Sequence, residues 1–248
     1  MSNNNIENFK YLDNLIHSRV KEIVLDSDIV LGSDEKSQYL NGIKLDVDDL
    51  AIDGNGHAID ALGLTRIFYC TGKNVTIKNI ILKNGFTKDD GGAIHNRGEL
   101  TITESTLQEN TTTRDGGAIR NDEGELTITD SEFCENSAET WGGAIENSGE
   151  LTMTDSTFTE NTASDGGAMN NLGELTITDS TFTQNTATRG GAISNTRGCE
   201  LRITRSVFTE NATLYNGYCG AIYNVISELN ITDCEFRENT ADMRGGAI

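Results

Sequence analysis

The sequence predicts an all-β fold, a single-stranded parallel β-helix, because one motif recurs along most of the chain and alternates apolar and polar residues. The clearest copy is GGAMNNLGELTITDSTFTQNTATR, which occupies residues 166–189. Its opening tetrapeptide GGAI, or a near copy of it, returns at intervals of 24 to 29 residues. The copies begin at Gly91, Gly116, Gly142, Gly166, Gly190, Cys219 and Gly245. Such a period is typical of solenoids, in which a repeat buries its apolar face only against stacked neighbours.

Each repeat is expected to form one rung of three short strands, with the sequences GAIxN, ELTITD and STFTxN. Apolar residues occupy every second position within them, which indicates strands rather than helices. Two of the inward columns are Ile94, Ile119, Ile145, Met169, Ile193, Ile222 and Leu107, Phe133, Phe158, Phe182, Phe208, Phe236. Crossovers between parallel strands of one sheet are right-handed, so the predicted β-helix is right-handed.

Two uninterrupted asparagine columns accompany the apolar ones. They are Asn96, Asn121, Asn147, Asn171, Asn195, Asn224 and Asn110, Asn136, Asn161, Asn185, Asn211, Asn239. Asparagine tolerates turn conformations, and stacked side-chain amides hydrogen-bond along the axis of a stack of strands. We therefore interpret both columns as structural.

The paired tetrapeptides GGAI and FxxN resemble the repeats of the chlamydial polymorphic outer-membrane proteins. FxxN occurs at Phe158–Asn161, Phe182–Asn185 and Phe208–Asn211, and the resemblance covers residues 91–248. Similar repeats occur in the wider group of adhesin-like and pectate-lyase-like right-handed parallel β-helix proteins. The resemblance implies an extracellular or cell-surface module that adheres to cells or matrix. It also implies a membrane anchor, which is absent from this chain.

The N-terminal segment, residues 1–19, is expected to form a short amphipathic helix. Its apolar stripe is Ile6, Phe9, Leu12 or Asp13, Ile16 and then Val20. The first rung of a solenoid has an open apolar end and unpaired strand edges. We therefore predict that this helix acts as a cap.

The rest of the chain is expected to be one continuous domain with two kinds of rung. Residues 20–90 have strand character without GGAI and predict degenerate rungs, whereas residues 91–248 predict the regular ones. The sequence stops at GGAI, four residues into another repeat. This position predicts that the repeats continue in a longer protein.

Composition excludes several classes of function. The chain has 248 residues and a formal charge of −20, which argues against nucleic-acid binding because that needs clustered Lys and Arg. It has no run of about 18 apolar residues that would predict a membrane-spanning helix, and no secretion signal is visible at its start. Five cysteines, an odd number at dissimilar repeat positions, predict no disulfide framework.

Catalysis is suggested only by IDGNGHAI, residues 52–59. Asp53 and His57 resemble the first rung of pectate-lyase-like proteins, but Asp-Gly-Asn-Gly is primarily a turn sequence. Hydrolysis needs two positioned carboxyl groups, and β-elimination needs a base and usually calcium. The acidic residues form no distinctive cluster, and the other histidines, His17 and His95, lie in unrelated regions. We therefore expect no enzyme and no histidine-based metal site, with a polysaccharide lyase or hydrolase as an alternative.

Three acidic columns are expected to face outward. They are Glu99, Glu125, Glu150, Glu174, Glu200, Glu228; Glu104, Asp130, Asp155, Asp179, Arg205, Asp233; and Glu109, Glu135, Glu160, Gln184, Glu210, Glu238. Like charges about 5 Å apart in water repel by roughly 0.8 kcal/mol, which stacking can absorb. We expect no cofactor and interpret the columns as solvated faces, with calcium bridging of neighbouring rungs as the alternative.

Outward threonine pairs form a flat Thr-x-Thr array at Thr101 and Thr103 and at the equivalent positions of the next three rungs. Such an array resembles the ice-binding face of some antifreeze proteins, and ice binding is a second alternative function. The glutamates share this face and the array fails at Arg202 and Asn230, both of which count against that alternative.

The corner after each FxxN is the most variable part of the repeat, and loops carry function on rigid scaffolds. The candidate binding residues there are Arg114, Trp141, Arg189, Tyr215, Tyr218 and Arg244. Aromatic residues with scattered arginines suit a glycan or a protein partner. The predicted function is therefore a non-catalytic, adhesin-like module that binds a cell-surface or matrix protein or a glycan.

Overall fold

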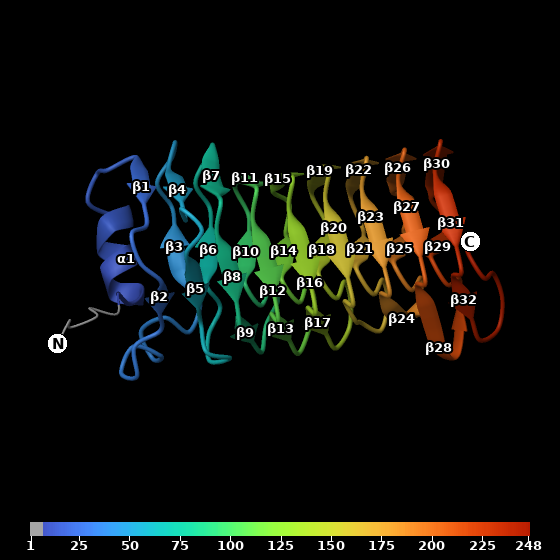
Figure 1. Ribbon diagram of the computed structural model, residues 1–248, viewed down its shortest axis with the longest axis horizontal. Helices are drawn as coiled ribbons and strands as arrows, with labels where there is room; N and C mark the ends of the chain where they lie inside the picture. The colour runs from blue at the N-terminus through green and yellow to red at the C-terminus, as the bar shows by residue number, and fades with distance from the viewer. Residues whose placement is uncertain (1–6) are drawn as a thin grey trace.

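The computed structural model describes residues 7–248, which form an elongated parallel β-solenoid of about eight rungs (Figure 1). Three long sheets run along its axis, and successive rungs add one strand to each. Every strand pair described is parallel, as in Ile94↔Ile119 and Ile102↔Ile128. The predicted fold class is confirmed.

The strands alternate around the solenoid in a fixed order. Sheet 1 contains β1 (Glu22–Val24), β4 (Ala51–Asp53), β7 (Val75–Lys78), β11 (Glu99–Thr103), β15 (Glu125–Thr129), β19 (Glu150–Thr154), β22 (Glu174–Thr178), β26 (Glu200–Thr204) and β30 (Glu228–Thr232). Sheet 2 contains β2 (Ile29–Val30), β5 (Ala58–Asp60), β8 (Ile81–Lys83), β12 (Thr106–Gln108), β16 (Glu132–Cys134), β20 (Thr157–Thr159), β23 (Thr181–Thr183), β27 (Val207–Thr209) and β31 (Glu235–Arg237). Sheet 3 contains β3 (Ile43–Leu45), β6 (Phe68–Cys70), β10 (Ile94–Asn96), β14 (Ile119–Asn121), β18 (Ile145–Asn147), β21 (Met169–Asn171), β25 (Ile193–Thr196) and β29 (Ile222–Val225).

The corner after FxxN, treated as a loop in the sequence, also contains short paired strands. They are β9 (Phe86–Thr87), β13 (Thr111–Thr112) and β17 (Ser137–Ala138) in one small sheet, and β24 (Thr186–Arg189), β28 (Ala212–Tyr218) and β32 (Thr240–Ala241) in another. The corner is therefore a partly ordered edge rather than a free loop.

The core is a narrow column of stacked side chains. Phenylalanines from successive rungs of sheet 2 lie face to face, and the ring centroids of Phe158 and Phe182 are 5.0 Å apart. Both asparagine columns form ladders in which each side-chain Nδ2 donates to the Oδ1 of the next rung, as from Asn161 to Asn185 at 2.9 Å. All of these asparagines except Asn224 and Asn239 are buried, so the bonds satisfy amides that would otherwise be costly to bury. The structural interpretation of both columns is confirmed.

Helix α1 (Phe9–Ile16) covers the N-terminal end of the solenoid (Figure 1). The side chain of Asn8 accepts a hydrogen bond from the backbone N–H of Tyr11, which caps the first turn. Phe9, Leu12 and Ile16 are fully buried against the first rungs. The predicted capping helix is thus confirmed.

The apolar stripe of this helix is shorter than predicted. Ile6 lies outside the described residues. The helix ends at Ile16, and Val20 is 45% exposed. The extension of the stripe to Val20 was wrong, because the backbone leaves the helix before that residue can reach the buried face.

Paired glycines precede five of the sheet 3 strands, β10, β14, β18, β21 and β25. Gly142 has a φ of 63°, which favours glycine. A Cβ on Gly143 would clash with the carbonyl oxygen of Gly167 in the next rung. Cys219, which replaces the first glycine of its pair, keeps the same left-handed conformation with a φ of 61°. All five cysteines are free thiols.

Candidate functional site: a groove over sheet 3

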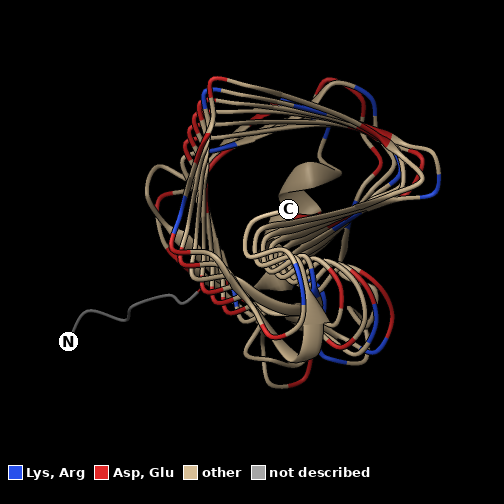
Figure 2. Cartoon of the chain, turned by 90° about the vertical axis from the view of Figure 1, so that its right-hand side faces the viewer, with Lys and Arg blue, Asp and Glu red and all other residues tan. Residues whose placement is uncertain are grey.

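The outward residues of sheet 3 form one ladder along the solenoid. In chain order they are Lys44, Tyr69, His95, Arg120, Glu146, Asn170, Ser194 and Tyr223. Glu146, Asn170 and Ser194 are no more than 3% exposed although they point away from the core. Viewed along the axis, the cross-section is indented at the side where the chain ends, and loops project on both sides of the indentation (Figure 2). Ser148, in the turn after Asn147, contacts Glu146 and contributes to its burial.

Two hollows lie over this ladder. The N-terminal hollow, of about 390 Å³, is lined by Asn41, Lys44, Arg66, Tyr69, Asp89, Asp90, His95 and Arg114. The second, which we call the Trp141 hollow, has about 360 Å³ and is lined by Trp141, Asp165, Asn170, Leu172, Arg189, Ser194, Thr196, Arg197, Tyr223, Val225 and Ile226. We refer to the two hollows and the ladder between them as the sheet 3 groove.

The N-terminal hollow is built around a buried arginine. Arg66 is 4% exposed, and its Nε donates to the carbonyl oxygen of Gly91 at 2.9 Å. Tyr69 packs edge-on against His95, with ring centroids 5.2 Å apart. Burial, reinforced by the Arg66 guanidinium, holds the pKa of His95 below its ordinary value. His95 is therefore expected to be uncharged at neutral pH.

The Trp141 hollow combines aromatic faces with guanidinium groups. The guanidinium of Arg197 lies over the Trp141 ring, 5.4 Å from its centroid. Arg189 makes a two-pronged ion pair with Asp165, with N···O distances of 2.6 and 2.5 Å. The same guanidinium lies 5.9 Å from the ring centroid of Tyr223.

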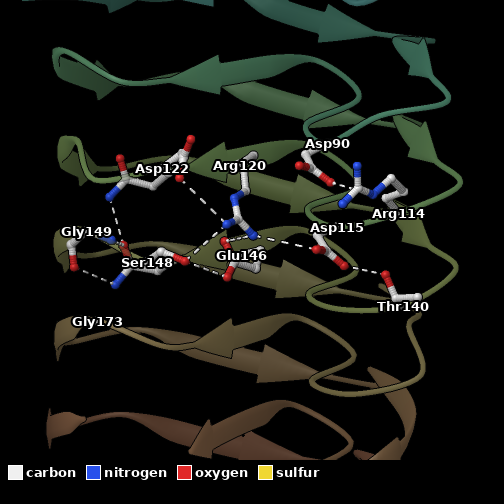
Figure 3. A network of polar contacts seen from close by, with 12 residues as sticks. Asp90, Arg114, Asp115, Arg120, Asp122, Thr140, Glu146, Ser148, Gly149 and Gly173 are labelled. Atoms are coloured by element: carbon white, nitrogen blue, oxygen red, sulfur yellow. Dashed lines mark hydrogen bonds and ion pairs between the residues drawn. The ribbon is translucent and has the colours of Figure 1, made fainter. Parts of the chain in front are cut away.

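A buried contact between Arg120 and Glu146 lies on the ladder between the two hollows, and Figure 3 shows the polar groups around it. Arg120 Nη1 lies 2.5 Å from Glu146 Oε2, and Ser148 Oγ donates to Glu146 Oε1 at 2.9 Å. Asp115 and Asp122 also face the guanidinium, at 3.6 and 3.8 Å. Burial raises the pKa of Glu146 to about 8, although Arg120 and Ser148 oppose that rise. The pair fills the middle of the groove and leaves a hollow on each side.

Most of the binding residues predicted from the sequence lie along one edge of the solenoid. Trp141, Arg189, Tyr218 and Arg244 share one backbone ladder beside the groove. Arg114 lies one residue before the equivalent position of its rung, because Asp115 directly precedes GGAI there, as Trp141 and Arg189 do in their repeats.

These residues also differ in what they line. Arg114 lines the N-terminal hollow, and Trp141 and Arg189 line the other. Tyr215 lies outside both hollows and is 84% exposed. Tyr218 and Arg244 also lie outside the lining of both hollows.

Sequence reasoning missed most of the groove. It passed over Asp165, which shares the edge ladder, over Asp115 directly before the GGAI of its repeat, and over the whole outward ladder of sheet 3. One signal was present: the residue before the asparagine in GAIxN is Arg120 in one repeat and Glu146 in the next. In-register stacking alone would have paired these opposite charges.

The two residues considered for catalysis have other partners. Asp53 lies 3.2 Å from Lys78, and His57 lies 3.2 Å from Asp28. Within residues 7–248 no group of three or more His, Cys, Asp or Glu side chains is placed to hold a metal ion. In sheet 1 the threonines stack as expected, with Thr101 opposite Thr127, and the glutamates stack beside them.

Two comparisons bear on these repeats. The family model described as Chlamydia polymorphic membrane protein (Chlamydia_PMP) repeat matches residues 130–148 and 179–196. Each match runs from FxxN through the edge ladder to GGAI, so it includes Trp141 in one case and Arg189 in the other. The resemblance of the repeats is confirmed. A search of curated proteins finds no match to the chain. In the part of the chain that the structure describes, no helix has the length and apolar character needed to cross a membrane.

Proposed function

We propose that this chain is a non-catalytic binding module of an adhesin-like cell-surface protein, and that its ligand lies in the sheet 3 groove. The observation that carries the proposal is the pair of hollows on one ladder of a rigid solenoid, each lined by aromatic and arginine side chains. Aromatic and arginine residues are enriched among those that dominate binding energy. The match to a membrane-protein repeat supports a place at the cell surface.

The spacing of the hollows favours an extended ligand. Tyr69 and Ser194 are separated by five steps of the ladder. At about 4.8 Å per step this separation is roughly 24 Å. A glycan chain or an extended peptide could reach both hollows across the filled middle of the groove.

The chemistry of the groove supports binding rather than catalysis. Burial raises the pKa of the Glu146 carboxyl to about 8, yet this group is fully buried under Arg120 and Ser148. A general acid must come within hydrogen-bond reach of the atom that it protonates. A side chain with 0% exposure has no such access to a bound ligand.

The test is adhesion of labelled protein to cultured mammalian cells. The double variant Trp141→Ala and Tyr215→Ala is expected to reduce adhesion at least about fivefold, since truncating a central aromatic residue commonly costs more than 1 kcal/mol. The single variants separate the two locations, because Trp141 lines a hollow and Tyr215 lies on the exposed edge. The melting temperature serves as the folding control.

Unchanged adhesion of the double variant would remove both locations from consideration. Loss with Tyr215→Ala alone would move the site from the groove to the exposed edge. Release of reducing ends or unsaturated products from polysaccharides would favour the enzyme alternative instead.

A further inference from the structure

The Trp141 hollow holds a positive charge in a strongly acidic protein. The chain carries a net charge of −20, whereas this hollow is lined by two arginines and one aspartate. Asp165 neutralises Arg189 through the two-pronged pair. No carboxylate of the described residues lies within ion-pair distance of Arg197. The guanidinium over Trp141 therefore remains available to an anion.

The floor of the hollow offers a hydrogen-bond donor that lacks an acceptor. Asn170 is 3% exposed, and its Nδ2 has no hydrogen-bond partner among residues 7–248. Buried amide groups are almost always paired, because leaving one unpaired is unfavourable. The neighbouring ladder residue Ser194 lines the same hollow with its hydroxyl group. A ligand with hydroxyl or ring oxygens would supply the missing acceptor.

The walls are apolar and aromatic. Trp141 and Tyr223 face the hollow together with Leu172, Val225 and Ile226. Large apolar walls with a few placed polar groups are typical of small-molecule and sugar sites. A sugar ring has both an apolar C–H face for such walls and oxygens for the floor.

We propose that the Trp141 hollow binds a carboxylate-bearing sugar residue of a glycan, with the carboxylate on Arg197, the ring against Trp141 and a sugar oxygen on Asn170. The planar guanidinium matches a carboxylate through two parallel hydrogen bonds. This inference rests on the proposed function, because it names the ligand class of the same groove. An acidic peptide has the carboxylate but not the combination of ring face and hydroxyl oxygens.

The experiment compares acidic and neutral glycans in binding to the full chain by isothermal titration calorimetry. The pairs are 3′-sialyllactose with lactose, and hyaluronan hexasaccharide with chitohexaose. In about 50 mM salt we expect at least one acidic probe to bind at least about tenfold more tightly than its neutral counterpart. The preference should shrink at about 500 mM salt, since exposed charges are then screened.

The decisive variant is Arg197→Gln, which is expected to reduce the affinity for the acidic probe to about that of the neutral one. Arg202→Gln is the matched control: Arg202 is also exposed, but it pairs with Glu200 on sheet 1 and lies outside the hollow. It should leave binding unchanged. Both variants remove a surface charge, so their melting temperatures should stay close to that of the original chain.

Three results would overturn the inference: no binding of either acidic probe, equal binding of acidic and neutral probes, or unchanged binding by Arg197→Gln. Tighter binding of hexaglutamate than of both acidic glycans would assign the hollow to acidic peptides and also overturn it. Failure here is distinct from failure of the proposed function. If Trp141→Ala abolishes cell adhesion while Arg197→Gln does not, the module is an adhesin without this specificity. If an acidic glycan binds while the chain fails to adhere to cells, the specificity stands and the adhesin function falls.

Discussion

Replacing Glu146 by glutamine should stabilise the fold, and the gain in free energy of unfolding over the original chain should increase as the pH rises. Glutamine keeps the shape of the side chain, and its amide oxygen can accept from Arg120 while its NH₂ group donates to Ser148. The charge of Arg120 remains compensated, because Asp115 and Asp122 also face its guanidinium. The substitution therefore removes the ionisation of Glu146 with little change in packing.

The magnitude follows from the raised pKa. Burial moves the pKa of Glu146 from 4.5 to about 8. Between these pH values the folded protein holds a proton that the unfolded chain has released, so the free energy of unfolding falls as the pH rises. The fall is up to about 1.4 kcal/mol per pH unit, and at most about 5 kcal/mol over the interval. The glutamine side chain cannot ionise, so the Glu146→Gln variant lacks this loss of stability. The difference in free energy of unfolding between the variant and the original chain should grow from near zero at about pH 4.5 to its full value at about pH 9.

Urea unfolding followed by circular dichroism at several pH values between 5 and 9 measures this difference. Glu150→Gln is the matched control, because it removes a carboxylate from an exposed position in the same rung. The control should change the free energy of unfolding by a small amount that is similar below and above pH 7. If Glu146→Gln were instead destabilised equally at every pH, Glu146 would be ionised throughout as the partner of Arg120, and the reasoning from burial would be refuted.

Two further predictions concern the core and the acidic columns. Phe182→Ala should lower the free energy of unfolding by about 3–5 kcal/mol. Phe182→Leu should lower it by only about 1–2 kcal/mol, because Leu107 already occupies the same column. Equal losses for the two variants in urea unfolding would contradict this prediction. Calcium should raise the melting temperature no more than sodium chloride of equal ionic strength, because the described residues contain no group of three or more His, Cys, Asp or Glu side chains placed to hold a metal. A clearly larger shift with calcium would show that it bridges the rungs.

The side chains that face the core could be predicted because apolar residues and asparagines recur at the same positions of each regular repeat. A one-residue slip would turn every apolar side chain of a strand outward, so the alternation fixes the register. The ladder partners Phe158↔Phe182 and Asn171↔Asn195 are those that the sequence columns gave. The capping helix was also predictable from its stripe, but its last residue was not, since periodicity does not show where the backbone leaves the helix.

The environment of the outward-facing side chains was harder to predict, because their exposure depends on how far the neighbouring loops extend over the sheet. Glu146 and Asn170 occupy strand positions that normally face solvent, and polar residues there indicate a solvated face. Their burial arises from the corner before GGAI and the turn after GAIxN, which rise over sheet 3. Arg197 was overlooked for a related reason: it lies in that turn, far in sequence from Trp141.

The repeat lengths vary on the two sides of sheet 3, where the groove lies. The spacing between the leucine of sheet 1 and the Leu or Phe of sheet 2 is seven residues in all six repeats, as between Leu175 and Phe182. All the variation in repeat length falls in the two segments that flank sheet 3. The corner after FxxN has its longest form at residues 212–218, and the turn after GAIxN has its longest form at residues 196–199, which include Arg197.

Because surface segments tolerate insertions at little thermodynamic cost, the walls of the groove can change length while the core columns stay in register. A solenoid built in this way can alter what it binds without altering how it folds. The residue that we assign to the ligand carboxylate, Arg197, lies in such a lengthened wall.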